Sequence, residues 1–286
     1  MPGSRHGQID RKVFPPVAYL WSKFVAQCNK ETSMISDTLK SAFLEAITFD
    51  PIQRIATKRE EQLPVDYFAF YQAISSVYSS KIEGENIDFD SFYKHKFLGV
   101  KYQSDYTKRS EDLFSAYVFI QKNPLTHDHV FQAHRILSKH LLPASQRGKI
   151  RTNPMFVINE DDRIEYVACA PEQVQGELNR FFNRVADLLA TDLSALEVFF
   201  YAAQIHLVFV KIHPLQDGNG RTARLLEKWF LLEKLGPTAV SVELEKNYYT
   251  HRKDYYRNIR KIGLEYQTLD YSQALNFLLM TVNSLR

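Results

Sequence analysis

The amino-acid sequence predicts a predominantly helical protein with one small β-hairpin. Apolar residues recur at helical spacing along most of the 286 residues, and residues 194–212 are apolar almost all round. Strand-like runs are confined to residues 151–169. A helix that is apolar on every side is buried, so we expect residues 194–212 to run through the core.

The composition is that of an ordinary globular protein and names no partner. With 45% apolar and 24% charged residues, the chain can bury a large core in one helical domain or two modest ones. The net charge of +3 and the absence of a basic block give no indication of nucleic-acid binding. Cys28 and Cys169 stand apart and suggest neither a disulfide framework nor a zinc cluster.

The same sequence carries no sign of a membrane span or of a secretory signal. The first sixteen residues lack an apolar stretch, and the apolar run of residues 194–212 is interrupted by polar side chains. We therefore expect a cytoplasmic protein that does not bind membranes.

The N-terminal part is predicted to be a helical arm followed by a well-defined helix. Residues 1–62 are mixed, with one helix around residues 17–47. A second helix spans residues 64–84, with Pro64 in its first turn and Gly84 as its stop. Glu83 then lies in the last turn of this helix.

The remaining elements follow in order. The pattern predicts helices over residues 106–121, 127–142, 171–190 and 194–212, and again after Gly220. Ser194 and Glu197 form a capping box at the start of the core helix. Within residues 151–169, the runs 155–158 and 163–169 flank an acidic turn and predict the hairpin.

Residues 213–224, "HPLQDGNGRTAR", join two of these helices. Asp-Gly and Asn-Gly dipeptides more often mark a hairpin turn, but a hairpin needs a strand on each side and neither flank resembles one. Pro214 pushes the preceding residue out of the α region, so His213 is expected where the core helix ends.

The loop has the features of an anion site. Gly218, Asn219 and Gly220 precede a helix whose unpaired N–H groups and positive dipole end attract an anion. Arg221 and Arg224 are three residues apart on that helix, so both guanidinium groups can face one polyanion. A chain of phosphates is the natural ligand.

Two further residues of the loop fit the chemistry of a nucleotide. Asp217 is the only acid in the loop and is a candidate ligand for the Mg²⁺ that accompanies a nucleotide triphosphate. His213 is placed to accept a proton from a hydroxyl that attacks a bound phosphorus. These residues are suited to transfer from a nucleotide to an alcohol.

This stretch resembles the signature of the Fic (filamentation induced by cAMP) family, H-x-F-x-[DE]-G-N-G-R-x-x-R. Only Leu215 departs from it, in the place of the usual phenylalanine. "SSKIEG" at residues 79–84 is similar to the family's inhibitory motif, [ST]-x-x-x-E-[GN]. The hairpin occupies the place of the family's flap, and "RKDYYRNI" resembles the region that contacts adenine. The resemblance covers about two thirds of the chain and leaves out the first sixty residues.

The resemblance implies an all-α Fic-type helical core with a small β-hairpin flap and an N-terminal helical arm. It divides the chain into residues 1–110, with the inhibitory helix 64–84, and residues 111–286, with flap 151–169 and signature loop 213–224. The implied activity is transfer of AMP from ATP to a Ser, Thr or Tyr hydroxyl of a target protein, with ATP and Mg²⁺ required. The flap would hold the target segment by strand addition.

Site residues follow from the same resemblance. His213 would be the general base and Asp217 the Mg²⁺ ligand, while Asn219 and the glycine amides would cradle the α-phosphate. The nucleotide-binding residues would be Asp217, Gly218, Asn219, Gly220, Arg221, Thr222, Ala223, Arg224 and Tyr255. The inhibitory residues would be Ser79, Glu83 and Gly84, and the flap strand would be Met155, Phe156, Val157 and Ile158.

The position of Glu83 at a helix end also indicates a cationic partner, independently of the resemblance. A carboxylate in the last turn of a helix meets the negative end of the dipole at a cost of about 0.3–1 kcal/mol, so a cation from elsewhere would make its placement sensible. Arg224 is the expected partner, and a solvated glutamate near a helix end is the alternative.

Other interpretations remain open at this point. His206 fits no zinc spacing and is expected to be a core histidine, and Tyr255 could be core as easily as a nucleotide contact. The same site could instead remove AMP from modified proteins, or serve a non-catalytic module that senses ATP. No helix-turn-helix follows residue 236, and the target and a possible homodimer are not indicated by the sequence.

Overall fold

Helices make up most of the chain in the computed structural model, which describes residues 35–59, 66–102, 104–158 and 164–286. The described helices, in chain order, are α2 (Lys40–Glu45), α3 (Pro51–Arg59), α4 (Tyr67–Ile82), α5 (Phe89–Leu98), α6 (Ser104–Lys122), α7 (His127–Leu137), α8 (Pro171–Ala190), α9 (Ala195–Ile212), α10 (Asn219–Leu235), α11 (Leu244–Thr250), α12 (Arg252–Lys261) and α13 (Leu275–Asn283). Short 3₁₀ turns are η1 (Pro237–Ser241), η2 (Tyr266–Thr268) and η3 (Tyr271–Gln273). The predicted helical fold class is confirmed.

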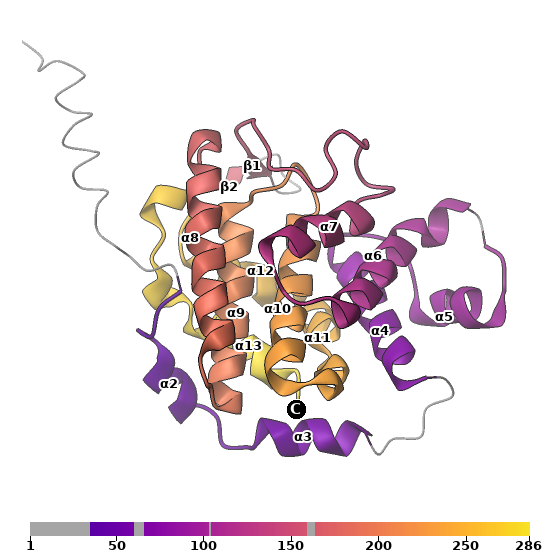
Figure 1. The fold of residues 1–286 in the computed structure, drawn as a ribbon, viewed down its shortest axis with the longest axis horizontal. Helices are drawn as coiled ribbons and strands as arrows, with labels where there is room; N and C mark the ends of the chain where they lie inside the picture. The colour runs from indigo at the N-terminus through magenta and orange to yellow at the C-terminus, as the bar shows by residue number, and fades with distance from the viewer. Residues whose placement is uncertain (1–34, 60–65, 103, 159–163) are drawn as a thin grey trace, which may run out of the picture. The chain divides into compact units, whose positions relative to one another are not determined.

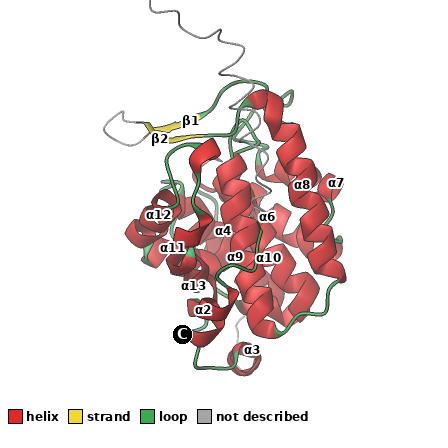
Figure 2. Cartoon of the chain, turned by 90° about the vertical axis from the view of Figure 1, so that its left-hand side faces the viewer, coloured by secondary structure: helices red, strands yellow, loops and turns green. Residues whose placement is uncertain are grey.

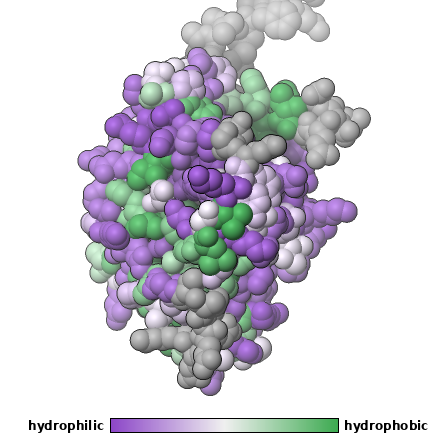
Figure 3. All heavy atoms as spheres, turned by 90° about the vertical axis from the view of Figure 1, so that its right-hand side faces the viewer, coloured by the Kyte–Doolittle hydropathy of each residue, from purple (hydrophilic) through white to green (hydrophobic). Residues whose placement is uncertain are grey.

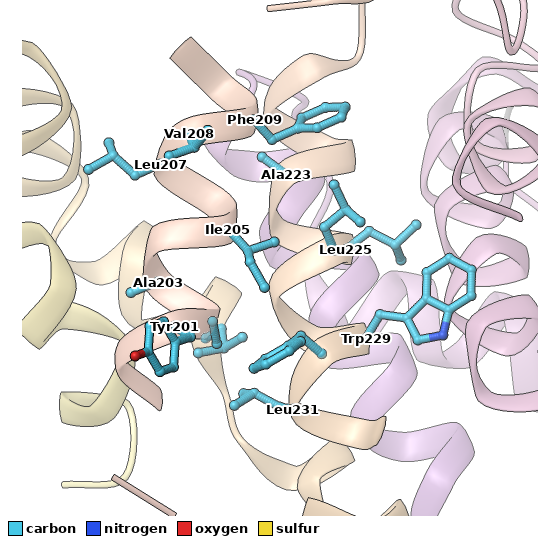
Figure 4. Packing of buried hydrophobic residues seen from close by; sticks show 14 of the residues in the cluster. Tyr201, Ala203, Ile205, Leu207, Val208, Phe209, Ala223, Leu225, Trp229 and Leu231 are labelled. Atoms are coloured by element: carbon cyan, nitrogen blue, oxygen red, sulfur yellow. The ribbon is translucent and has the colours of Figure 1, made fainter. Parts of the chain in front are cut away.

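Helix α9 is the centre of the core. It starts with the predicted capping box of Ser194 and Glu197, and nearly all its side chains are buried. Figure 4 shows α9 and α10 side by side, with apolar residues such as Ile205, Phe209 and Ala223 between them. Among the described helices, α9 is long and apolar enough to cross a membrane, but 78% of it is buried inside the protein, as expected of a core helix.

Helix α4 starts and ends through local signals. Asp66 is the N-cap, because its side chain accepts a hydrogen bond from Ala69 N–H at 2.9 Å. The sequence predicts Pro64 in the first turn, but the helix starts at Tyr67 and Pro64 lies outside the described residues. Glu83 is the C-cap, and Gly84 follows with a φ of 86° that favours glycine.

The two strands form the predicted hairpin. Strand β1 (Phe156–Ile158) pairs antiparallel with β2 (Ile164–Val167), and the acidic turn between them lies outside the described residues. The hairpin lies at the end of the bundle where α9 ends and α10 begins (Figures 1 and 2). Isolated bridges join Ile150 to Leu215 and Val167 to Glu265, so the hairpin region is attached to the loop after α9 and to the segment after α12.

Two predictions about the organisation of the chain need correction. Within the predicted helix 17–47, the described part is helical only over Lys40–Glu45, where buried Phe43 packs on Phe200 of α9. The expected boundary after residue 110 falls inside α6, and all described residues belong to one compact unit. The contacts that α6 makes with both α4 and α7 explain the continuity, because a helix packed on both sides leaves no place for a linker.

The C-terminal helices differ from one another. The sequence predicts core-like apolar helices after residue 237, and α13 fits that description. Helix α12 is mostly polar, and its buried residues are Tyr255 and Asn258. On the face of the molecule drawn in Figure 3, hydrophilic residues predominate and apolar residues form small separate areas.

Candidate active site

The loop between α9 and α10 begins with an unusual backbone conformation. His213 caps α9 with a φ of 53° and a ψ of 55°, and it is the only non-glycine residue with positive φ in the part of the chain that is described. The following Pro214 cannot continue the helix. Leu215, which replaces the family's phenylalanine, is buried and pairs with Ile150. The chain therefore turns sharply at His213, and the bridge from Leu215 to Ile150 fixes the residues that follow the turn.

The imidazole of His213 is neutral and can accept a proton. Its Nδ1 lies 3.0 Å from Val210 O, and only a protonated Nδ1 can donate to a carbonyl, so Nε2 carries the lone pair. Burial lowers the pKa of His213, and the charge of Arg151 lowers it further. The hydrogen bond to Val210 and the charges of Glu83 and Asp217 act in the opposite direction. The net result is a neutral ring at neutral pH.

Side chains within the signature brace the loop. Asn219 accepts from Leu215 N–H at 2.9 Å and donates to Leu215 O at 2.8 Å. The hydroxyl of Thr222 donates to Gly218 O at 2.9 Å, and Ala223 packs in the core. The side chains of Asn219 and Thr222 thus hold the loop and Ala223 lies in the core, while nucleotide binding by these residues stays a prediction.

The first turn of α10 keeps its donors for a ligand. Gly218 is the N-cap with a φ of 78°, and the N–H groups of Asn219, Gly220 and Arg221 precede the first acceptor within the helix. A Cβ on Gly220 would lie 2.6 Å from Oε1 of Glu83. The Glu83 carboxylate thus lies directly over the place where an anion would meet this helix end.

Glu83 pairs with Arg224, as the sequence suggested. Its Oε1 lies 2.6 Å from Nη2 of Arg224, a side chain that is only 1% exposed. Ser79 accepts from the same guanidinium through its hydroxyl at 2.8 Å and its carbonyl at 3.1 Å. Burial would raise the pKa of Glu83, but the charges of Arg224 and Arg221 outweigh it and the pKa is lowered. Glu83 is therefore a carboxylate that covers a buried arginine.

A second carboxylate, which sequence reasoning missed, pairs with the other arginine. Glu85 Oε1 lies 2.9 Å from Nη2 of Arg221 and 2.9 Å from Nη1 of Arg109. The buried Nε of Arg221 has no partner among the described residues. The only signal was the spacing Glu83-Gly84-Glu85, which places two acids beside one glycine turn.

His134 and Arg151 also support the loop and were not foreseen. His134 accepts from Gly148 N–H at 2.9 Å, so its other nitrogen donates to Asp217 O at 3.0 Å. Burial lowers the pKa of His134 to about 4, which keeps it neutral. Neither residue belongs to a local motif that would have identified it.

Asp217 is the loop's candidate metal ligand. Its side chain is exposed, and Oδ1 accepts from Gly218 N–H at 2.6 Å. No group of three or more His, Cys, Asp or Glu that could hold a metal occurs among the described residues. One carboxylate is enough for Mg²⁺, which binds through one or two carboxylates and completes its shell with phosphate oxygens and water.

Tyr255 lies in the core rather than beside a nucleotide. It is 1% exposed, and its hydroxyl contacts Nη1 of Arg224 at 3.2 Å and Nε2 of His206 at 3.0 Å. His206 in turn contacts Glu227 at 2.6 Å and is fully buried, as expected of a core histidine. Arg224 and the surrounding aromatic rings cover Tyr255, which favours the core alternative, and its direct contact with a nucleotide stays a prediction.

The flap strand presents one free edge. Phe156 pairs with Val167, while Ala168 N–H donates to Met155 O at 3.0 Å. Bonded and non-bonded pairs alternate in an antiparallel ladder, so the N–H and C=O of Phe156 point away from β2. Phe156 and Ile158 are 48% and 57% exposed.

Comparisons with known proteins agree with this geometry. Residues 124–231 match the profile of the Fic/DOC family. "Protein adenylyltransferase Fic" of Nematostella vectensis is 33% identical over 134 residues, which are 46% of this chain and 29% of the relative. The Drosophila willistoni protein of the same name is 28% identical over 171 residues, 59% of this chain and 30% of the relative. The chain thus spans about 30% of the length of these relatives.

Solved structures share the fold. A Fic family protein from Desulfovibrio desulfuricans G20 has a TM-score of 0.66 at 16% identity, covering 89% of this chain and 72% of its own. A Fic domain containing signaling protein from Bacteroides thetaiotaomicron VPI-5482 has a TM-score of 0.60 at 18% identity, covering 82% of this chain and 94% of its own. These likenesses show that the chain has the fold of these Fic proteins, and its sequence matches the Fic/DOC family over residues 124–231.

Proposed function

We propose that this chain transfers AMP from ATP to a hydroxyl side chain of a target protein. The observation that carries the proposal is the neutral His213, with its Nδ1 bound to Val210, beside a helix end whose N–H donors meet at Gly220. Relatives named protein adenylyltransferase support the reaction class. A base next to a phosphate cradle is the arrangement that such a transfer needs.

The chemical step balances with these groups alone. Nε2 of His213 accepts the proton of the Ser, Thr or Tyr hydroxyl, and the hydroxyl oxygen attacks the α-phosphorus of ATP. A bond forms between that oxygen and the α-phosphorus, and the bond from the α-phosphorus to the bridging oxygen breaks. Pyrophosphate leaves, and the target carries AMP.

The first turn of α10 would hold the phosphates. Its N–H groups and the positive end of the helix dipole favour an anion over Gly220. Arg221 has a buried Nε to offer, and Arg224 has a planar fork for a terminal phosphate. Mg²⁺ held by Asp217 would neutralise charge on the phosphates when it is bound.

In the proposed function, Glu83 inhibits the transfer of AMP. Its carboxylate pairs with Arg224 at 2.6 Å and lies where the phosphates would meet Gly220. ATP can then bind only with its phosphates displaced, and a misplacement near 1 Å costs on the order of 10²-fold in rate. Release of Glu83 would therefore start transfer without a new binding site.

Replacing Glu83 tests the proposal. Wild type, Glu83→Gly and Glu83→Gly with Arg224→Ala are incubated with labelled ATP and magnesium, and AMP is measured by mass spectrometry on the protein itself and on lysate proteins. Glu83→Gly should raise transfer on the order of 10²-fold with little change in the ATP concentration for half-maximal rate. Adding Arg224→Ala should remove the gain, since the phosphate loses its fork.

Two controls sharpen the result. Glu83→Gln keeps the volume of the side chain and removes its charge, so activation by this variant identifies the ion pair as the restraint. His213→Ala added to Glu83→Gly should show no transfer. Equal transfer by folded wild type and Glu83→Gly would contradict the restraint, and no AMP in any variant would contradict the activity.

Removal of AMP from modified proteins is a second candidate. The position of Glu83 favours it, because a carboxylate over Gly220 can orient a water toward a phosphorus held there. Incubation of wild type with AMP-modified protein, compared with incubation with labelled ATP, shows the dominant direction. Release of AMP that is lost in Glu83→Gly would favour this second candidate.

A further inference from the structure

Arg151 is a buried arginine that binds main chain on both sides of the active site. Its side chain donates from Nε to His213 O at 2.6 Å and from Nη1 to Asn153 O at 2.7 Å. Nη2 donates to Cys169 O and, at 3.5 Å, to Ile212 O. The residue is 3% exposed, and all four of these acceptors are backbone carbonyls.

These four carbonyls belong to two regions with different tasks. Ile212 and His213 form the end of α9 and the proposed base. Asn153 and Cys169 flank the two strands of the flap at its base. Arg151 N–H also donates to Pro214 O at 2.9 Å, so main chain and side chain of the same residue bind the loop. One side chain thus joins the base of the flap to the backbone of His213.

His213 needs such support. A left-handed backbone costs a residue other than glycine about 1 kcal/mol or more, and it persists only where the surroundings hold it. The hydrogen bond from Arg151 Nε to His213 O fixes the peptide that follows this residue, and Val210 O fixes the ring. Together the two contacts determine where Nε2 points.

An arginine suits this position better than a lysine. Its planar guanidinium carries five donors in a rigid fork, whereas a lysine offers one ammonium on a flexible stem. Carbonyls from three separate segments can be reached at once only by the fork. The charge has a second effect, because it disfavours a proton on the nearby ring of His213.

We infer that Arg151 is a positioning residue for the transfer reaction: it fixes His213 relative to the flap, so that the base and the target hydroxyl are held in one arrangement. This inference rests on the proposed function. It assigns Arg151 no contact with ATP or with the reacting atoms. Its effect should therefore be on the maximal rate and on the ionisation of His213, and not on the binding of ATP.

The charged groups around His213 define what a titration should show. Burial and the charge of Arg151 lower the pKa of His213, while Glu83 from the end of α4 and Asp217 from the loop raise it. Removing the charge of Arg151 should raise this pKa, so the acid limb of the rate profile should move to higher pH. Arg151→Lys keeps a cation and should leave the limb nearly in place.

The kinetic experiment compares two substitutions in the full chain carrying Glu83→Gly. Self-modification with labelled ATP is followed from acidic to neutral pH at several ATP concentrations. Arg151→Lys and Arg151→Gln should each lower the maximal rate on the order of 10²-fold, with the half-saturating ATP concentration nearly unchanged. Only Arg151→Gln should also shift the acid limb. Arg147→Gln is the matched control, because Arg147 donates to Leu142 O from the same connection without contacting His213.

A measurement without turnover keeps the inference independent of the proposed function. The His213 ring is titrated by NMR in the full chain with Glu83 intact, and its signal is assigned with His213→Ala. Arg151→Gln should raise the pKa of His213, because the charge of Arg151 lowers it, and Arg147→Gln should leave it unchanged. An unchanged pKa in folded Arg151→Gln, or a maximal rate in Arg151→Lys equal to that of its parent, overturns the inference. If the parent transfers no AMP, the proposed function fails and the NMR result alone decides the role of Arg151.

Discussion

The signature loop and the flap form two sides of one site and are held in opposite ways. Residues 213–224 are mostly buried and are braced from α4, α7 and the base of the flap, through Ser79, His134 and Arg151. The flap is a short ladder whose exposed side carries Phe156, Ile158 and Ile164, which are 48%, 57% and 58% exposed. Strand β2 and the base attach the flap to the rest of the protein: Glu165 pairs with Arg260, Tyr166 donates to Lys211 O at 2.6 Å, Val167 bridges to Glu265, and Arg151 binds the base.

On the proposed function, this difference separates the catalytic loop from the strand that binds the target. Groups that act on a transition state must be in place before the substrate arrives, so the loop is braced by contacts that allow little movement. A strand edge that accepts an extended segment needs only main-chain donors and acceptors and tolerates varied side chains. On the proposed function, changes in the loop should stop every transfer, whereas changes in the flap should affect protein targets alone.

The largest effect is expected from His213→Ala. Loss of a general base typically costs 10²–10⁴-fold in rate, and this residue makes no phosphate contact in the proposed step, so ATP binding and folding should persist. Transfer and ATP binding are measured in the Glu83→Gly background. If the rate fell only slightly, the base would have to be sought outside the loop.

Asp217→Asn should come next. An amide oxygen is a poorer partner for a hard cation than a carboxylate, so the magnesium concentration for half-maximal transfer should rise about tenfold or more. The titration is made with magnesium in the Glu83→Gly background. An unchanged magnesium dependence would remove Asp217 from the metal site.

A proline in the flap tests the other side of the comparison. Phe156→Pro deletes an N–H that points away from β2, so it should lower modification of lysate proteins about three- to tenfold, the value of one hydrogen bond of about 1 kcal/mol. ATP binding should not change. Val157→Pro is the matched control, because Val157 pairs with Tyr166 and its N–H faces β2, so this change should open the hairpin itself. If Phe156→Pro left target modification intact, the hairpin would have a structural role only.

The smallest effect is expected from Glu85→Gln. Glu85 pairs with Arg221 and Arg109, and the side chains of Glu85 and Arg109 are 20% and 48% exposed, so water reaches part of this cluster. A partly exposed ion pair contributes about 0–1 kcal/mol, so transfer should rise by less than about fivefold. Measured beside Glu83→Gly, the change shows whether one carboxylate or both restrain the loop. Activation equal to that of Glu83→Gly would make the restraint a shared one.

Local signals in the sequence determine much of this protein by themselves. Gly84 ends α4, Ser194 and Glu197 start α9, and Pro214 ends it. Each of these signals acts through residues within about four positions, so the sequence alone determines where these helices start and end. The twelve residues of the signature likewise determine a glycine-containing loop that leads into the N-terminus of α10.

The tertiary structure alone decided which groups meet at that site. Glu83 and Arg224 are 141 positions apart, and here a motif served as a guide. Glu85 meets Arg221 across 136 positions, Arg151 meets His213 across 62, and His134 meets Asp217 across 83. No periodicity or spacing encodes these contacts, because they depend on how α4, α7 and the flap pack against α9 and α10.

Tyr255 is a second case in which the sequence could not determine the position of a side chain. Its helical spacing allowed either a core position or a nucleotide contact, and the sequence could not choose between them. The packing of α12 and α13 around α9 buries its ring among Tyr248, Phe277 and His206, and its hydroxyl supports Arg224 from below the site. Local chemistry determined which residues could act, and long-range packing of apolar surfaces determined which of them face a ligand and which hold the others in place.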